Sequence, residues 1–149
     1  MLFKRYLSKK DFQSLSSTIG DAEKSTCGQI RVVVRHRRHR SEWKLTLHEL
    51  ALGEFYRLGM EKTHARTGVL ILILFSERQF QIVADDGIHT RVEDGTWEKI
   101  AEEMSSHFRK GRFRDGIAEA IRTVGAVLAH HFPRESGDAN ELPDEIVER

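Results

Sequence analysis

The sequence predicts an α/β domain in which a small mixed sheet carries helices on both faces. Two runs, Ile30–Val34 and Gly68–Phe75, are apolar at nearly every position, which is typical of strands buried on both faces. A short polar turn joins the second run to a third strand, Phe80–Ala84, so these two strands should form an antiparallel hairpin. A helix between the first two strands makes them parallel neighbours.

Four segments carry apolar residues at helical spacing. The first begins after Ser8, which is placed to cap free backbone N–H groups, and Asp11 stands three residues later. The others are expected from about Trp43 to Leu58, from Trp97 to Phe108, and from near Asp115 to Phe132. The predicted buried residues are Ile30, Val32, Val34, Leu70, Leu72, Ile82, Trp97, Met104, Ile121 and Leu128.

The length of 149 residues suits one domain, which we expect to cover residues 1–133. Residues 134–149 are polar, acidic and poor in large apolar groups, so we expect a loosely ordered C-terminal tail. Two apolar pairs in this tail, Leu142-Pro143 and Ile146-Val147, are candidates for local docking.

Composition excludes several classes of protein. Lys and Arg (24) nearly cancel Asp and Glu (23), whereas a dedicated nucleic-acid binder carries a basic excess. The single cysteine, Cys27, excludes an internal disulfide and a Cys-rich zinc site. No run approaches the roughly 20 apolar residues of a spanning helix, and no signal peptide is evident. We therefore expect a cytoplasmic protein with neither a membrane nor a nucleic acid as partner.

The basic run Arg35–Arg40 has no interleaved aromatic residue for base stacking. A solvated crossover loop is therefore a simpler interpretation of this run than a site for phosphate or nucleic acid. Among the eight histidines, His130 and His131 are adjacent and point about 100° apart on a helix. With no His-Glu-x-x-His motif, zinc is not predicted.

The order of the elements and several local strings resemble the TPM domain family. Together these strings extend from about Gly28 to Pro133, and the resemblance rests on their order and spacing. They are Gly68-Val69-Leu70-Ile71-Leu72, Arg78-x-Phe80, Trp97-x-x-Ile100-x-x-x-Met104-x-x-x-Phe108-x-x-Gly111, and Gly116-Ile117 running on to Gly125, Leu128, His131, Phe132 and Pro133.

The resemblance implies a three-layer, Rossmann-like α/β/α sandwich without a nucleotide fingerprint. Many members of the family are exported and anchored by a membrane helix, but this sequence shows neither feature. It is similar to the shorter, free-standing branch that ends in His-Phe-Pro. Family members have been linked to divalent-cation binding, to photosystem repair in photosynthetic members, and to a phosphatase activity.

The loop after the third strand holds the best candidate ligands, Asp85, Asp86, Glu93 and Asp94. Carboxylates gathered beside a glycine are hard oxygen ligands suited to Ca²⁺ or Mg²⁺. On the residues alone a structural interpretation is simpler: Asp94 caps the following helix, while Asp85 and Asp86 are solvated turn residues. The family's link to divalent cations favours a metal site at Asp85, Asp86 and Asp94, with Glu93 as reserve ligand.

These observations predict a non-catalytic domain of the TPM type that binds Ca²⁺ or Mg²⁺ and serves as an accessory or protein-interaction module. The alternative is a metal-dependent phosphatase acting on phosphomonoesters. Because no Gly-x-Ser-x-Gly elbow, P-loop or Cys/His signature occurs, the sequence offers no clear nucleophile and leaves open whether the protein is an enzyme.

Overall fold

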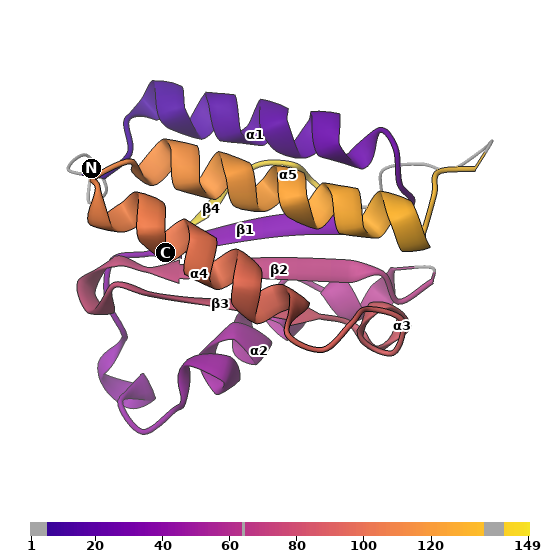
Figure 1. Cartoon of the computed structure of the whole chain (residues 1–149). Helices are drawn as coiled ribbons and strands as arrows, with labels where there is room; N and C mark the ends of the chain where they lie inside the picture. Colours follow the sequence, from indigo (N-terminus) through magenta and orange to yellow (C-terminus); the bar gives the residue numbers. More distant parts are fainter. Residues whose placement is uncertain (1–5, 64, 136–141) are drawn as a thin grey trace.

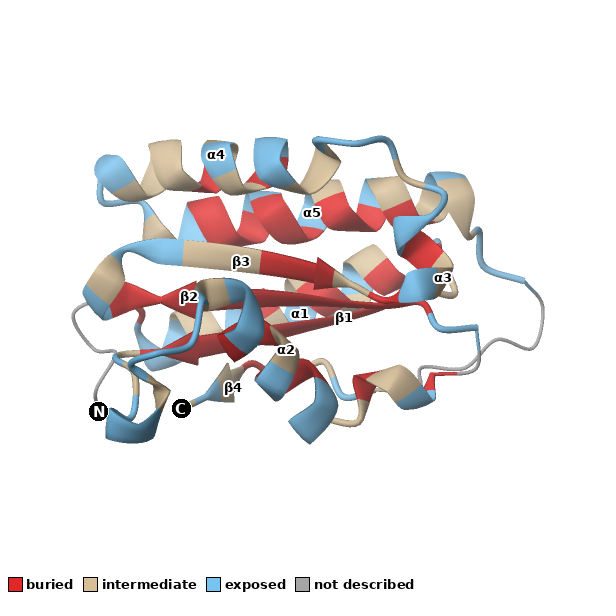
Figure 2. Cartoon of the chain, turned by 90° about the horizontal axis from the view of Figure 1, so that it is seen from below, coloured by how far each residue is buried: buried red, intermediate tan, exposed pale blue. Residues whose placement is uncertain are grey.

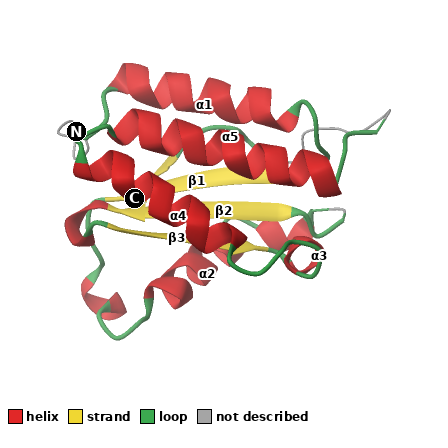
Figure 3. Ribbon diagram, viewed as in Figure 1, coloured by secondary structure: helices red, strands yellow, loops and turns green. Residues whose placement is uncertain are grey.

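The computed structural model describes residues 6–63, 65–135 and 142–149. Helices and strands alternate along most of the chain (Figures 1 and 3). In chain order they are α1 Lys9–Glu23, β1 Gln29–Arg35, η1 Arg40–Glu42, α2 Leu47–Arg57, η2 Met60–Lys62, β2 Gly68–Leu74, η3 Phe75–Glu77, β3 Gln79–Ala84, α3 Asp86–His89, α4 Thr96–Arg109, α5 Phe113–His131 and β4 Val147–Glu148, where η denotes a short 3₁₀ helix.

The strands form one mixed sheet in the order β3-β2-β1-β4. The central strands β1 and β2 are parallel and pair along their full length, with Ile30 opposite Val69. Strand β3 pairs with β2 in antiparallel register through the tight turn at η3, which confirms the predicted hairpin. Since β3 runs back along β2, its last residue, Ala84, lies opposite Val69 near the start of β2.

Helices cover both faces of the sheet, as predicted for the α/β class. Helices α1, α4 and α5 lie on one face and α2 lies on the other (Figure 1). Alternate residues of each central strand face opposite layers: Ile71 and Ile73 join the larger apolar cluster, whereas Leu70 and Leu72 join the cluster under α2. All seven residues of both β1 and β2 are buried (Figure 2). Burial on both faces explains the continuous apolar sequence of β2, whereas β1 also buries Gln29, Arg31 and Arg35.

Capping determines where two of the helices begin. At α1 the Ser8 hydroxyl accepts from Asp11 N and the Asp11 carboxylate accepts from Ser8 N, so the predicted start is confirmed. The predicted start of the second helix at Trp43 is wrong. Thr46 and Glu49 form an equivalent capping box, so α2 begins at Leu47, and Trp43 is 69% exposed.

Nine of the ten residues predicted to be buried are buried, and Trp97 is the exception. It occupies the first turn of α4, where its ring packs against the edge of the larger cluster and stays partly exposed. Within α4 the fully buried positions are Ile100 and Met104, one and two turns further along. The predicted apolar face of α4 is therefore confirmed, but its first residue, Trp97, lies at the rim of the core.

The last eight residues return to the sheet. Strand β4 pairs in parallel with Val33 and Val34 of β1, and Ile146 is buried in the larger cluster. Leu142 N donates to the Gln29 side chain at 3.0 Å. Residues 142–149 thus pack against the domain through both of the apolar pairs, Leu142-Pro143 and Ile146-Val147. The expectation of a loosely ordered tail does not describe these eight residues. Residues 136–141 lie outside the described residues.

Candidate functional site

The acidic loop that was predicted to bind a cation lies at the amino ends of β1 and β2. This position follows from the antiparallel direction of β3, whose carboxyl end lies beside Gly68 at the start of β2; Asp85 N donates to Gly68 O at 2.9 Å. Ligands of open α/β sheets bind beyond the carboxyl ends of the parallel strands. The acidic loop therefore lies at the opposite end of the parallel strands from that crevice.

Asp85 is buried, with 5% of its surface exposed, and it is held by an arginine. Arg66 donates from Nε and Nη2 to the two carboxylate oxygens, both at 2.9 Å. Asp85 also accepts from Asp86 N at 2.8 Å and caps helix α3. This bidentate bond raises the pKa of the Arg66 guanidinium. The negative charge of the Asp85 carboxylate is thus balanced by the Arg66 guanidinium within the protein.

The other candidate ligands are exposed. Asp86 opens the short helix α3, and its side chain is 91% exposed at 3.8 Å from Arg66. Glu93 and Asp94 lie in the loop before α4, whose N-cap is Gly95 and not Asp94. Across the described residues no three His, Cys, Asp or Glu side chains are gathered so that they could hold a metal ion.

Sequence reasoning did not identify Arg66, which lies 19 residues before Asp85. Its φ of +55° is uncommon for a non-glycine residue, and it brings the guanidinium onto the carboxylate. The same turn approaches α3 closely: a Cβ on Gly87 would lie 2.5 Å from Arg66 O, so only glycine fits there. The acidic loop and the turn before β2 therefore form one packed unit.

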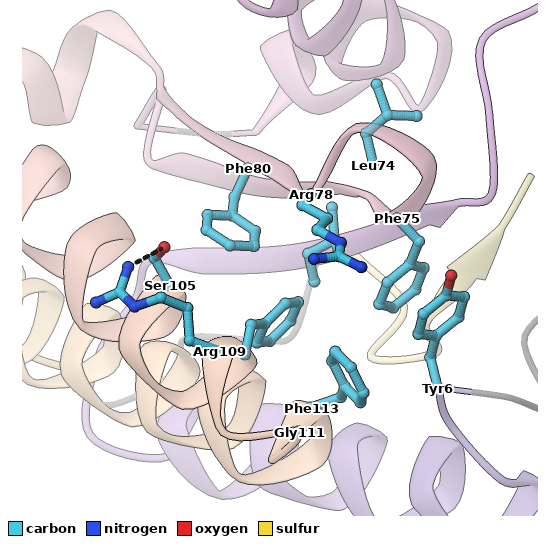
Figure 4. A pocket seen from close by; sticks show the side chains of 11 residues that line it. Tyr6, Leu74, Phe75, Arg78, Phe80, Ser105, Arg109, Gly111 and Phe113 are labelled. Carbon is cyan, nitrogen blue, oxygen red and sulfur yellow. Dashed lines mark hydrogen bonds between the residues drawn. The ribbon is translucent and has the colours of Figure 1, made fainter.

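A second candidate site lies at the carboxyl end of β2. A pocket of about 490 Å³ opens between the β2–β3 turn and the turn that joins α4 to α5 (Figure 4). Its walls are mostly apolar, and the polar side chains on it are two arginines, one serine and one tyrosine. The lining residues are Tyr6, Ile73, Leu74, Phe75, Arg78, Phe80, Ser105, Phe108, Arg109, Gly111 and Phe113.

Aromatic rings build the pocket. Tyr6 stacks on Phe75 with ring centres 4.3 Å apart, and Phe113 meets Tyr6 edge-on at 5.3 Å. Phe108 makes edge-to-face contacts with Phe80 at 4.9 Å and with Phe113 at 5.0 Å. These are favoured aromatic geometries, so the rings support one another around the cavity.

Two guanidinium groups stand at this pocket. In Figure 4 the side chain of Arg78 extends from the β2–β3 turn over the rings, while Arg109 lies at the rim on α4. Arg109 Nη1 donates to Ser105 Oγ at 3.2 Å. Within the described part of the chain, the Arg78 side chain has no hydrogen bond or ion pair.

The nearby acidic groups already have partners in the basic run. Arg35 is 1% exposed and donates to both Glu42 oxygens, which holds the pKa of that carboxyl below its ordinary value. Arg38 Nε donates to Glu77 at 2.6 Å. The expectation of a solvated basic loop is therefore wrong for Arg35 and Arg38, because each packs against a carboxylate that follows it in the chain.

The two sites differ in what they can do chemically. The acidic loop offers oxygen ligands, but its buried carboxylate is bonded to Arg66. The pocket offers an apolar cavity with donors at its mouth, and no carboxylate, imidazole or thiol is among its lining residues. Sequence reasoning missed it because Phe108 was assigned to the apolar stripe of its helix and Tyr6 was not among the candidate residues.

Comparisons with known proteins agree with the fold. An NMR structure of the BA42 protein from the psychrophilic bacterium Bizionia argentinensis is 30% identical, with a TM-score of 0.86 over 97% of this chain and 96% of that one. The N-terminal domain of a P. gingivalis protein (19% identity, TM-score 0.69, 85% and 79% covered) shares the fold. The N-terminal domain of the cg2496 protein from Corynebacterium glutamicum also shares the fold, with 13% identity and a TM-score of 0.61 over 90% of this chain and 79% of that one.

No curated protein matches this chain. Among the described residues no helix is long and apolar enough to cross a membrane. The TPM domain profile matches residues 3–127, which is most of the chain. With the agreement in fold and the resemblance of its sequence strings, this match establishes that the chain belongs to the TPM domain family.

Proposed function

We propose that this TPM domain is a non-catalytic binding domain and that the aromatic pocket is its ligand site. The lining carries the proposal, since five aromatic side chains surround a volume of about 490 Å³. Pockets of roughly 300–1,000 Å³ with apolar walls and few polar groups are typical of small-molecule sites. Ser105 has no base beside it among the lining residues, so the geometry favours binding over covalent chemistry.

A neutral apolar probe tests this function. Decanol, kept below its solubility limit, should shift the amide resonances of Phe80, Ser105 and Gly111 in a saturable manner. Ser105→Leu should weaken this binding because the larger side chain enters the pocket. The control is Ser106→Leu, the next position of α4, which does not line the pocket. Decanol that shifts none of these resonances, or shifts them equally in both variants, would overturn the proposal.

A divalent-cation site at the acidic loop is our second candidate. It is favoured by the exposure of Asp86, Glu93 and Asp94, whose carboxylates an ion in solution can reach. Ca²⁺ takes about 6–8 oxygen ligands, and waters and backbone carbonyls would supply the remainder. Because Arg66 holds both oxygens of Asp85, the ion would have to displace this arginine while the loop closes.

Competition between Arg66 and the cation gives a direct test. A bound ion stabilises the folded state, by about 2.7 kcal/mol at a hundredfold excess over Kd. Calcium should raise the melting temperature of Arg66→Gln at lower concentration than that of the unmodified protein, and a chelator should reverse the effect. Asp86→Asn should weaken it. Millimolar Ca²⁺ and Mg²⁺ that leave the melting curves and the loop resonances of both proteins unchanged would rule the site out.

The phosphatase alternative depends on the same ion. A bound cation with an open position polarises a phosphoryl oxygen, but this chemistry also requires an attacking group. If the cation test succeeds, magnesium-dependent hydrolysis of a generic phosphomonoester should be abolished in Asp86→Asn. Activity that survives this substitution would belong to another site or to a contaminant.

A further inference from the structure

We infer that the aromatic pocket takes an amphipathic anion, with its apolar part among the rings and its charged head at Arg78 and Arg109. This inference rests on the proposed function and specifies its ligand class. The shared chemistry of the head group is a carboxylate or a phosphate monoester, each of which accepts two parallel hydrogen bonds from a guanidinium.

The apolar part is assigned by the depth of the pocket. Phe75, 4% exposed, forms the inner wall, while Phe80, Phe108 and Phe113 are partly exposed around it. An acyl chain or aryl group entering between these rings leaves water for an apolar surface, which is favourable in proportion to the area covered.

The head group is assigned by Arg78. Its backbone has φ +51° at the β2–β3 turn, a position where glycine or asparagine is the usual residue. An arginine there projects its guanidinium over the rings (Figure 4). Its neighbour Glu77 is bonded to Arg38, so no adjacent carboxylate neutralises Arg78.

Arg109 adds a second donor on the facing wall. It is exposed at the end of α4 and holds Ser105 Oγ, which leaves its other guanidinium hydrogens available. Lys110 and Arg112, exposed in the α4–α5 turn, have no carboxylate partner among the described residues and add to the positive potential. A cleft lined by one sign of charge attracts ligands of the opposite sign.

Aromatic cages also bind organic cations, so this alternative needs an argument. A cation would have to approach two guanidinium groups at the mouth of the pocket, and no lining residue is acidic. The charge at the mouth therefore favours an anion over a quaternary ammonium group.

Four probes with the same ten-carbon chain separate these possibilities: decanoate, decyl phosphate, decanol and decyltrimethylammonium. Each is titrated below its micelle concentration and followed by calorimetry and amide resonances. Both anions should bind roughly tenfold or more tightly than decanol, since a charge-assisted hydrogen bond contributes at least this factor. The ammonium probe should bind most weakly. Added salt should weaken binding of the anions and leave decanol unaffected.

Single substitutions assign the head-group contacts. Arg78→Gln and Arg109→Gln should each weaken decanoate roughly tenfold while changing decanol by less than about twofold. Arg122→Gln, an exposed arginine of α5 that does not line the pocket, is the matched control and should leave all four probes unchanged. Whichever anion binds more tightly identifies the head group.

The failures of the two proposals are distinguishable. Decanol binding as tightly as decanoate, or Arg78→Gln weakening both equally, would overturn the anion inference and leave the apolar binding site standing. If none of the four probes shifts the pocket resonances, both proposals are wrong. Preferential binding of the ammonium probe would replace the anion with a cation.

Discussion

Two arginines with left-handed backbones stand at opposite ends of strand β2, and their surroundings differ. Arg66, with φ +55°, precedes the strand, and Arg78, with φ +51°, follows it. Arg66 donates two hydrogen bonds to the buried carboxylate of Asp85. Arg78 lies over an aromatic pocket and makes no side-chain hydrogen bond within the described part of the chain.

The difference separates a structural arginine from a candidate binding arginine. A left-handed conformation is unfavourable for a side-chain-bearing residue and persists when surrounding structure compensates for it. Asp85 compensates at Arg66, where the ion pair joins α3 to the turn before β2. At Arg78 the backbone N donates to Phe75 O at 3.1 Å, but among the described residues no acceptor pairs with the guanidinium, and this is the reason we assign Arg78 to a ligand.

Buried carboxylates extend the comparison, because Glu54 pairs with two arginine side chains and Glu23 accepts a hydrogen bond from the backbone. Glu54 is 1% exposed and lies between Arg57 at 2.8 Å and Arg149 at 3.0 Å. Glu23 is 4% exposed, and its Oε2 accepts from Ile30 N at 2.7 Å. Burial, reinforced by the neighbouring Asp144 carboxyl, raises the pKa of Glu23 from 4.5 to about 9.

The largest expected effect is on the pH dependence of stability. Between the unfolded pKa of 4.5 and the folded value of about 9, the folded state binds the Glu23 proton and the unfolded state does not. Rising pH in this window therefore destabilises the protein, and Glu23→Gln should remove that decline. Urea unfolding at about pH 5 and about pH 9 measures it.

Glu54→Gln is the matched control for Glu23→Gln. It leaves Arg57 and Arg149 without their carboxylate, so it should lower stability at neutral pH, where Glu23→Gln should raise it. Stability changes of the same sign in the two variants would show that Glu23 is not the proton-binding group.

The next effect concerns Asp85. Asp85→Ala removes the cap of α3 and leaves Arg66 without its carboxylate, so the free energy of unfolding should fall by roughly 2 kcal/mol. Asp86→Ala, at an exposed neighbour, should change it by less than about 0.5 kcal/mol. Urea denaturation of both variants tests this. A small effect of Asp85→Ala would mean that the bonds from Arg66 to Asp85 add little stability and that Asp85 is available as a cation ligand.

The sequence predicted the strands well because their apolar runs depend only on burial of both faces. It predicted the chemistry less well because partners lie far apart in the chain. Nothing near Asp85 indicates that Arg66 will reach it, and the direction of β3 decides that the acidic loop lies at the amino ends of β1 and β2. Long-range contacts of this kind have no local pattern.

The pocket was missed for a related reason. Its walls come from Tyr6, three residues before α1, from the β2–β3 turn and from the α4–α5 turn, and only the folded chain brings these segments together. Phe108 was correctly placed on the inner face of its helix, but helical spacing does not distinguish a ring inside the core from a ring that borders a cavity. Arg78 was noticed only as part of a hairpin string.

The smallest effect gives the sharpest test of the comparison between the arginines. Glycine adopts a positive φ without the penalty of roughly 1–2 kcal/mol that a side chain incurs. Arg78→Gly should therefore raise the free energy of unfolding by about 0.5–1 kcal/mol, part of the gain being offset by the greater freedom of glycine in the unfolded chain. Its affinity for decanoate should fall with that of Arg78→Gln. Arg66→Gly relieves the same backbone conformation but removes both hydrogen bonds to Asp85, so its stability should decrease. Urea denaturation of the two glycine variants should therefore give stability changes of opposite sign. A loss of stability in both variants would mean that the Arg78 side chain already stabilises the fold. The assignment of Arg78 to a ligand would then be wrong.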